Sequence, residues 1–236
     1  MRIMTLALVL IASSAIAQNN PVVIELFTSQ GCSSCPAADK NLAEILEEAE
    51  KAGQPVFGLS FHVDYWNYVG WKDPYSDAEY TMRQRAYSLF VHAATVYTPQ
   101  MIVNGAAEFV GSDIKVSHDA VAQALTQKTE YPISLGAVEQ RGGKIVVPYT
   151  LEKRPAGFTI NAAIVERNLE NDVPRGENAG RKLAHRNVVR SFVSKGAQKT
   201  GVIEIVLPSQ LTASSLIVFL QDNQWHTKGA AAAKLN

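Results

Sequence analysis

The sequence predicts a protein of two domains, an α/β domain with a mixed sheet followed by an all-β, immunoglobulin-like sandwich. Two observations predict this fold. Strand-length apolar runs alternate with helix-length amphipathic segments as far as about residue 130, and only short alternating runs follow. The domains are therefore expected over residues 18–130 and 131–236.

Residues 1–17 are expected to form a secretory signal peptide. Arg2 gives a positive start, residues 3–11 are apolar, and the small residues at 15–17 are typical of a cleavage site. Cleavage after Ala17 would send the protein to the periplasm or the exterior, where disulfides persist. The apolar run is too short to span a membrane, and no later segment approaches the required length.

The first domain should contain strand, helix, strand, helix, strand, strand and helix in that order, which gives a mixed sheet with helices on both faces. Asn104-Gly105 between apolar runs is a strong hairpin signal. Ser112 or Asp113 is expected to cap the last helix. The expected segments are strands 21–27, 55–63, 100–103 and 106–110 and helices 37–51, 77–94 and 112–127.

Cys32 and Cys35 are the only cysteines, and they fall where the first strand gives way to the first helix. A thiol there meets unpaired N–H groups and the positive end of the helix dipole, which lower the thiol pKa. Cys32 is therefore the expected nucleophile, acidic and reachable, and Cys35 its disulfide partner. Pro36 suits the first helical turn, and Ser33 and Ser34 can donate hydrogen bonds to a thiolate.

Two other roles compete with a redox-active pair. Zinc requires four ligands, and the sequence offers no second cysteine pair and no closely spaced histidines. A purely structural disulfide across two residues closes a very small loop and therefore stabilises little. A redox-active pair is the favoured interpretation.

The order of elements, with a CxxC after the first strand and Thr98-Pro99 before the hairpin, resembles the thioredoxin superfamily. The resemblance implies that Pro99 is cis, that its loop faces the cysteines, and that the Thr98 backbone pairs with a partner chain. It also implies that Cys32 forms a mixed disulfide, which Cys35 resolves.

Two further features concern the surroundings of the cysteines. The resemblance places thioredoxin's buried carboxylate at Leu26, so the neighbouring Glu25 is either a buried base or an anchor for an adjoining loop. The aromatic segment 61–75 follows the second strand at its carboxyl end, where α/β sheets place their sites. Trp66 would belong to a substrate-binding wall there, the alternative being that Trp66 and Trp71 pack on the core.

Four longer motifs between Glu25 and Arg190 resemble a bacterial secreted family catalogued as domain of unknown function 1223. They are ELFTSQGCSSCPAAD, HVDYWNYVGW, VYTPQMIVNG and GENAGRKLAHRNVVR. Membership implies a thioredoxin-like fold with a CxxC motif and implies no substrate.

The second domain is expected to be a sandwich of short strands joined by one long polar loop. The loop, residues 171–186, contains Arg175, Arg181 and Arg186, which could bind a carboxylate or dock on the first domain, solvated charge being the favoured interpretation. The tail 230–233 is a terminal strand or a frayed end. The expected strands are 133–138, 144–151, 158–165, 187–193, 201–207 and 215–221.

We therefore expect a periplasmic or secreted thiol-disulfide oxidoreductase that acts on the thiols and disulfides of exported proteins, with an unidentified redox partner. No organic cofactor or resident metal is expected. The chain has 22 basic and 22 acidic residues, and this balance does not favour binding to nucleic acid. Oxidant, reductant and isomerase roles remain open.

The alternative is an exported ligand-binding or copper-binding protein in which the cysteine pair is a metal site or a static bond. Copper(I) takes thiolates, and His62 or His92 could add a ligand. The copper-delivery proteins with this arrangement have three residues between their cysteines, however, and this chain has two.

Overall fold

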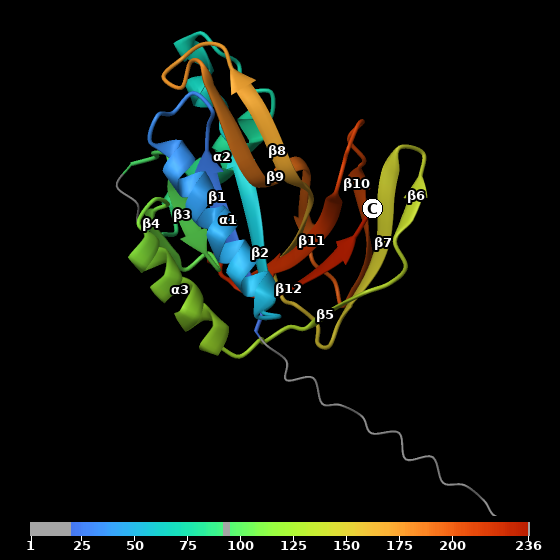
Figure 1. The fold of residues 1–236 in the computed structure, drawn as a ribbon. Coiled ribbons are helices and arrows are strands. Elements are labelled where there is room, and N and C mark those ends of the chain that lie inside the picture. Colours follow the sequence, from blue (N-terminus) through green and yellow to red (C-terminus); the bar gives the residue numbers. More distant parts are fainter. Residues whose placement is uncertain (1–19, 92–94, 236) are drawn as a thin grey trace, which may run out of the picture.

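A computed structural model describes residues 20–91 and 95–235 (Figure 1). The first half contains β1 (Val22–Thr28), α1 (Cys35–Lys51), β2 (Val56–His62), the 3-10 helix η1 (Asp64–Val69), α2 (Ala78–Ser88), β3 (Gln100–Val103), β4 (Ala107–Val110) and α3 (Ile114–Thr126). The second half contains β5 (Ile133–Leu135), β6 (Glu139–Arg141), β7 (Lys144–Leu151), β8 (Thr159–Val173), β9 (Arg181–Gly196), β10 (Thr200–Val206), β11 (Ser214–Gln221) and β12 (Thr227–Lys234).

Eight of these strands form one mixed sheet in the order β12-β11-β8-β9-β2-β1-β3-β4. β1 is parallel to β2 and antiparallel to β3. β2 continues the sheet into the second half by pairing in parallel with β9, through Ser60 and Val188. The remaining strands, β5, β6, β7 and β10, form a smaller antiparallel sheet.

The predicted fold class, a thioredoxin-like α/β domain followed by a separate immunoglobulin-like sandwich, is wrong. β8, β9, β11 and β12 extend the sheet of the first half and do not form a sandwich of their own. Apolar periodicity locates strands but carries no information on which distant strand an edge will meet. The division into domains at residues 130 and 131 stays a prediction.

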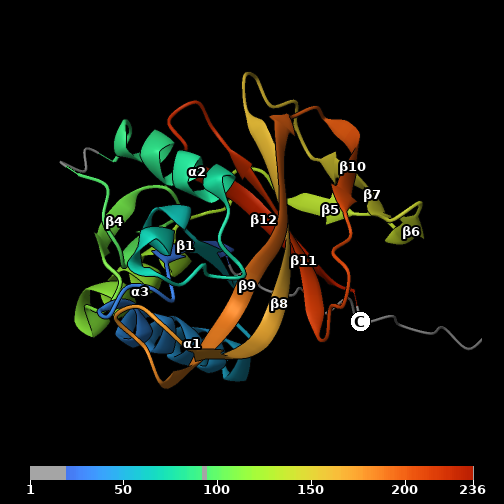
Figure 2. The same ribbon diagram turned by 90° about the horizontal axis from the view of Figure 1, so that it is seen from above.

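Helices and the small sheet cover the large sheet on both faces (Figure 2). On one face, α1 and α3 pack on β1 and β3 around Leu26, Leu42 and Met101. Beside them, the small sheet packs on β8 and β11 around Val147 and Ile164. α2 lies on the opposite face, over a third apolar cluster that joins both halves of the chain. β1 is buried along its whole length because both of its faces are covered.

Most elements of the first half lie where the sequence predicted them. Asn104 and Gly105 both have positive φ, as a tight hairpin turn requires, and a Cβ on Gly105 would lie 1.9 Å from the Trp225 carbonyl oxygen. Asp113 caps α3 by accepting from the Val116 amide. α2 ends at Ser88 rather than at residue 94. Residues 1–19, with the predicted signal peptide, and residues 92–94, with His92, lie outside the described residues.

The predicted polar loop 171–186 is instead the end of a long β-hairpin. β8 pairs with β9 from Thr159 to Val173, whereas β11 pairs with β8 only as far as Glu166. Residues 167–187 therefore leave the sheet as a two-stranded arm, and its turn, residues 174–180, is here called the tip. β9 packs against α1, so the arm rises beside that helix (Figure 1).

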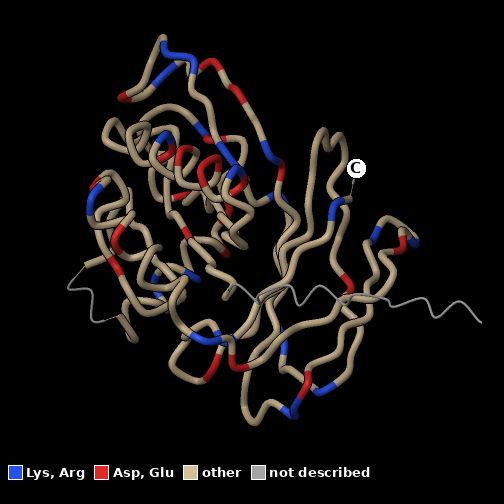
Figure 3. Tube along the Cα trace, turned by 60° about the horizontal axis from the view of Figure 1, so that its bottom comes forward, with Lys and Arg blue, Asp and Glu red and all other residues tan. Residues whose placement is uncertain are grey.

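The alanine-rich tail belongs to β12, an edge strand of the large sheet, as one of the two expectations had it. Basic and acidic residues both occur along the arm and around the fold (Figure 3). None of the helices in the described part of the chain is both long and apolar enough to cross a membrane.

Candidate redox site

The two cysteines lie where β1 ends and α1 begins. A turn follows β1, and Cys35 is the first residue of α1. Cys32 and Cys35 form a disulfide, and both are buried, with 1% and 0% of their surface exposed. Ser33 and Ser34 between them are exposed. The Cys32 sulfur is therefore not openly reachable, contrary to what its position in the sequence suggested.

The loop before β3 lies against the Cys32 sulfur. The Thr98-Pro99 bond is cis, and the Thr98 carbonyl oxygen lies 3.9 Å from Cys32 Sγ. Trp66, on η1, donates from Nε1 to Thr98 Oγ1 at 2.7 Å. Ser34 Oγ lies 3.3 Å from the same sulfur. With Cys35, the structure thus brings six of the predicted site residues together, and their roles stay a prediction.

The tip of the arm covers the turn that contains Cys32. Asn178 is fully buried, and its Nδ2 donates to the carbonyl oxygens of Gln30 at 3.0 Å and Cys32 at 2.9 Å. Glu177 Oε2 accepts from the Ser33 amide at 2.9 Å. These contacts attach a segment from the second half of the chain directly to the cysteine turn.

Glu177 provides a negative charge at the amino end of α1. Within the described chain, the N-cap residue Ser34 makes no side-chain hydrogen bond to the helix, so an outside acceptor serves the Ser33 amide instead. Hydrogen bonds from the Ser33 side chain and amide lower the pKa of Glu177. A carboxylate therefore lies where a Cys32 thiolate would also be stabilised.

Two buried histidines lie directly behind the cysteine turn. His62 Nδ1 lies 2.7 Å from Asp73 Oδ2, and the same oxygen accepts from the Gln30 amide at 2.8 Å. Gln30 Nε2 lies 3.2 Å from His185 Nε2. The rings of His62 and His185 meet edge to face with centroids 4.8 Å apart. The arm, through His185, is therefore joined to β2 as well as to the turn.

Asp39 completes this group, which we call the histidine cluster: His62, Asp73, His185 and Asp39. Asp39 lies one helical turn after Cys35 on α1, and its Oδ2 is 3.5 Å from His185 Nδ1. Asp39 Oδ1, His185 Nδ1 and His62 Nε2 are buried and have no hydrogen-bond partner among the described residues. Such unsatisfied buried atoms are uncommon in folded proteins, and they gather here beside the disulfide.

The charge state of the histidine cluster follows from competing effects on its ion pair. Burial lowers the pKa of His62, but the Asp73 and Asp39 carboxylates together raise it more, so the net shift is upward. Burial raises the pKa of Asp73, but His62 and the Gln30 amide lower it more, so the net shift is downward. Both shifts favour a charged pair.

Glu25 lies away from the disulfide, because strand alternation turns it to the face of the sheet that α2 covers. Arg83 Nε donates to Glu25 Oε2 at 2.5 Å, and its Nη2 donates to Oε1 at 2.8 Å. Tyr87 also donates to Glu25, and Gln221 donates to the Tyr87 hydroxyl. Of the two roles expected for Glu25, this arrangement fits an anchor between α2 and the sheet.

A family model described as "Protein of unknown function (DUF1223)" matches residues 23–221, which include both cysteines, Thr98-Pro99 and the arm. The chain belongs to this family. No protein with a curated description matches. The DUF1223 match shows the family, as the sequence motifs indicated, and does not show an activity.

One solved structure covers nearly the whole chain. It is the crystal structure of protein AGR_C_4864 from Agrobacterium tumefaciens, 28% identical, with a TM-score of 0.66. The similarity covers 93% of this chain and 96% of that one. It therefore extends over both predicted domains, in agreement with the continuous sheet.

Sequence reasoning missed the residues that lie near the disulfide in space but far from it along the chain. Asn178, Glu177 and His185 come from the segment 171–186, which was expected to be a polar loop, and Asp39 lies within the predicted helix 37–51. Arg181, one of the three arginines considered for docking, donates to Asn178 Oδ1 at 2.9 Å and so supports the tip. The buried Asp39, next to Cys35 on the helix, was the one local signal available.

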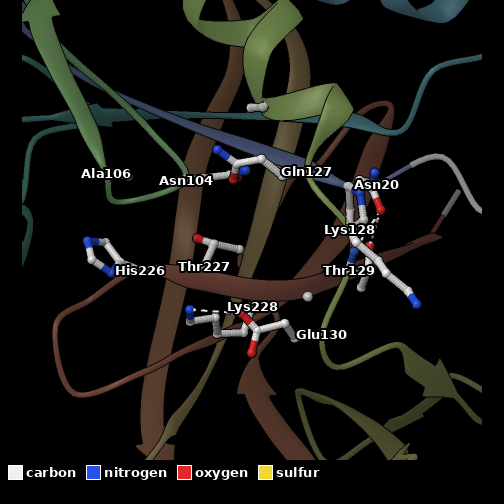
Figure 4. Close-up of a pocket in the computed structure, with 13 residues that line it drawn as sticks. Asn20, Asn104, Ala106, Gln127, Lys128, Thr129, Glu130, His226, Thr227 and Lys228 are labelled. Carbon is white, nitrogen blue, oxygen red and sulfur yellow. Dashed lines mark hydrogen bonds and ion pairs between the residues drawn. The ribbon is translucent and has the colours of Figure 1, made fainter.

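A polar hollow lies far from the cysteines, at the opposite end of β1 (Figure 4). Its volume is about 180 Å³, and its polar groups largely satisfy one another. Asn20 Oδ1 accepts from the Thr129 amide, and Lys228 pairs with Glu130. Among the described residues, no group of three or more His, Cys, Asp or Glu side chains is placed to hold a metal ion. The copper alternative stays a prediction.

Proposed function

We propose that this protein catalyses thiol–disulfide exchange with exported proteins through Cys32 and Cys35. The observation that carries the proposal is the position of the Cys32 sulfur, at the start of α1 and 3.9 Å from the Thr98 carbonyl oxygen. The amino end of a helix stabilises a thiolate. The Thr98 carbonyl offers an extended partner chain a backbone hydrogen bond beside the reacting sulfur.

Exchange can run in the direction that oxidises the partner. A partner thiolate attacks Cys32 Sγ, the bond to Cys35 breaks, and Cys35 leaves as a thiolate that takes up a proton. A second partner thiol loses its proton and attacks the mixed disulfide, which releases the oxidised partner and the Cys32 thiolate. Two electrons pass to the cysteine pair, and the reverse sequence reduces the partner.

The predicted signal peptide supports an exported location, in the periplasm or outside the cell. Disulfides form and persist there, so a cysteine pair can exchange with other exported proteins. The reaction needs no bound organic cofactor, since the sulfur atoms themselves carry the electrons.

The cover over Cys32 sets a condition on the reaction. Asn178 and Glu177 hold the backbone of the cysteine turn, and we expect these contacts to open before a partner thiolate reaches the buried Cys32 sulfur. Glu177 is exposed and Asn178 is buried. The hydrogen bonds of Asn178 are therefore expected to be harder to open than the one to Glu177. Exchange is therefore expected to be gated by the tip of the arm.

The burial of Cys32 favours a second candidate, in which the disulfide is a static bond that fixes the turn beneath the tip. Measuring the reduction potential separates the two. A catalytic pair should lie well above roughly −300 mV, the level below which structural disulfides are found. A potential below that level would reject exchange and favour the static bond.

Partner capture tests the proposal directly. A Cys35→Ala chain, expressed with its signal peptide, should accumulate mixed disulfides through Cys32 that disappear on reduction. A Cys32→Ala, Cys35→Ala chain is the matched control and should capture nothing. Equal capture by both chains, or none by either, would contradict the proposed activity.

A further inference from the structure

A notch in the large sheet lies at the base of the arm. β2 and β9 pair only at Ser60 and Val188, so the start of β2 diverges from β9. Asn187 bridges part of the gap by donating from Nδ2 to the Gly58 carbonyl oxygen at 3.1 Å. The rest is a hollow of about 310 Å³ between α1, the base of the arm and β12. Its size falls within the range of small-molecule sites.

The walls of the notch combine apolar and cationic side chains. Leu46 on α1, Phe57 on β2 and Ile217 on β11 supply apolar lining. Arg167, Arg186 and Lys234 supply cations, and Glu50 supplies a carboxylate. A ligand here would therefore meet both an apolar surface and a group of positive charges.

Positive charge exceeds negative charge in the notch. Arg167 Nη2 donates to both oxygens of Glu50, at 2.9 and 2.8 Å, and Arg186 Nη2 donates to Glu50 Oε2 at 3.3 Å. The hydrogen bond from Arg167 is the main cause of a lowered Glu50 pKa, and Lys234 lowers it further. The nearby Glu47 is already paired with Lys51 at 2.6 Å. One carboxylate thus faces three cations.

Arg186 shows that this charge is incompletely neutralised. Its Nε is buried and has no hydrogen-bond partner within the described residues. Burial and the neighbouring Arg167 lower the pKa of Arg186. A second anion in the notch would relieve the repulsion between the arginines.

We propose that the notch binds a small organic anion, a carboxylate on a short aliphatic or aromatic body. The carboxylate would lie between Arg186 and Lys234, and the body would lie on Phe57 and Ile217. Glu50 would compete with the ligand for the arginines. The site lies apart from the disulfide and does not depend on thiol–disulfide exchange.

Calorimetric titration of the purified chain with hexanoate and with the neutral hexanamide tests this site. Hexanoate should bind roughly tenfold more tightly than hexanamide, because only the carboxylate makes charge-assisted hydrogen bonds. Glu50→Gln should tighten hexanoate binding several-fold by freeing the arginines, an effect that a merely structural ion pair would not produce. Arg186→Gln should weaken it.

Two variants keep the test decisive if Arg186→Gln fails to fold. Ala232→Leu fills the notch without changing its charge and should abolish binding. Lys182→Gln removes a cation of the arm that pairs with Glu170 outside the notch, and it should bind hexanoate unchanged. Equal affinity for hexanoate and hexanamide, no saturable binding, or undiminished binding in Ala232→Leu would overturn the proposal.

Discussion

Two groups of buried charge lie on opposite faces of β1 and β2, and they differ in the cation that each contains. The arginine cluster, Glu25, Arg83, Tyr87 and Gln221, lies under α2. The histidine cluster lies under the cysteine turn on the other face. Both Glu25 oxygens accept hydrogen bonds, whereas three atoms of the histidine cluster lack partners among the described residues.

The difference shows which cluster responds to pH. Arginine stays charged at any ordinary pH, so the pair between Glu25 and Arg83 is permanent. Histidine changes charge near neutral pH, so the pair between His62 and Asp73 depends on pH. The permanent pair joins α2 to the sheet, and the pH-dependent pair lies beside the proposed reaction site.

Replacing Arg83 should destabilise the fold most. Arg83→Leu leaves Glu25 buried without its cation, which typically costs roughly 3–5 kcal/mol. It also removes a guanidinium that lies 4.8 Å from the Phe192 ring centroid and 5.1 Å from that of Trp225. Urea unfolding at pH 7 should show this loss. A loss smaller than that of His62→Gln at pH 5.5 would contradict the expected order of the two clusters.

Replacing His62 should have a smaller effect that changes with pH. The folded pKa of His62 is raised and that of Asp73 is lowered, so their pairing contributes fully between about pH 4 and pH 6.5. The contribution declines as pH rises through the raised pKa of His62, and as pH falls through the lowered pKa of Asp73. His62→Gln should therefore cost roughly 1–3 kcal/mol near pH 5.5 and less at alkaline pH.

The measurement is urea unfolding of wild type and His62→Gln at several pH values. Ser60→Ala, at a buried polar position on the same face of β2, is the matched control and should show a difference independent of pH. A His62→Gln loss that grew with rising pH would reverse the assigned sign.

Removing Asn178 should make the disulfide, which lies beside the histidine cluster, easier to reach. Asn178→Ala deletes two buried hydrogen bonds to the cysteine turn, so the tip should open more often. Reduction by dithiothreitol under native conditions should accelerate by roughly tenfold or more. Asn171→Ala, which removes an arm contact to Tyr75 away from the tip, is the control. An unchanged rate would mean that the tip does not limit access.

Replacing Glu177 should change the pKa of the Cys32 thiol more than the stability of the fold. Glu177→Gln removes an exposed negative charge from the amino end of α1, so the Cys32 thiolate should be favoured in the reduced protein. The pH profile of iodoacetamide alkylation should shift to lower pH by less than about one unit. Glu170→Gln, elsewhere on the arm, should leave the profile in place. A shift to higher pH would show that Glu177 does not oppose the thiolate.

The sequence predicted the candidate site in part. Cys32, Cys35 and Thr98-Pro99 were recognisable because a CxxC motif, a strand-to-helix junction and a proline before a hairpin are local signals. Asn178 and Glu177 were not, because a polar segment with two glycines is typical of a loop and gives no sign of which turn it will contact. His185 was not recognisable for the same reason.

By itself, the sequence determined the helices, most of the strands and the hairpin turn at Asn104-Gly105, since apolar periodicity, capping residues and turn residues act over a few neighbouring positions. Only the tertiary structure decided that β2 pairs with β9, that the arm folds over Cys32, and that Arg186 faces Glu50. These contacts join segments far apart in the chain, and burial of both faces of one sheet, rather than any local preference, selects them.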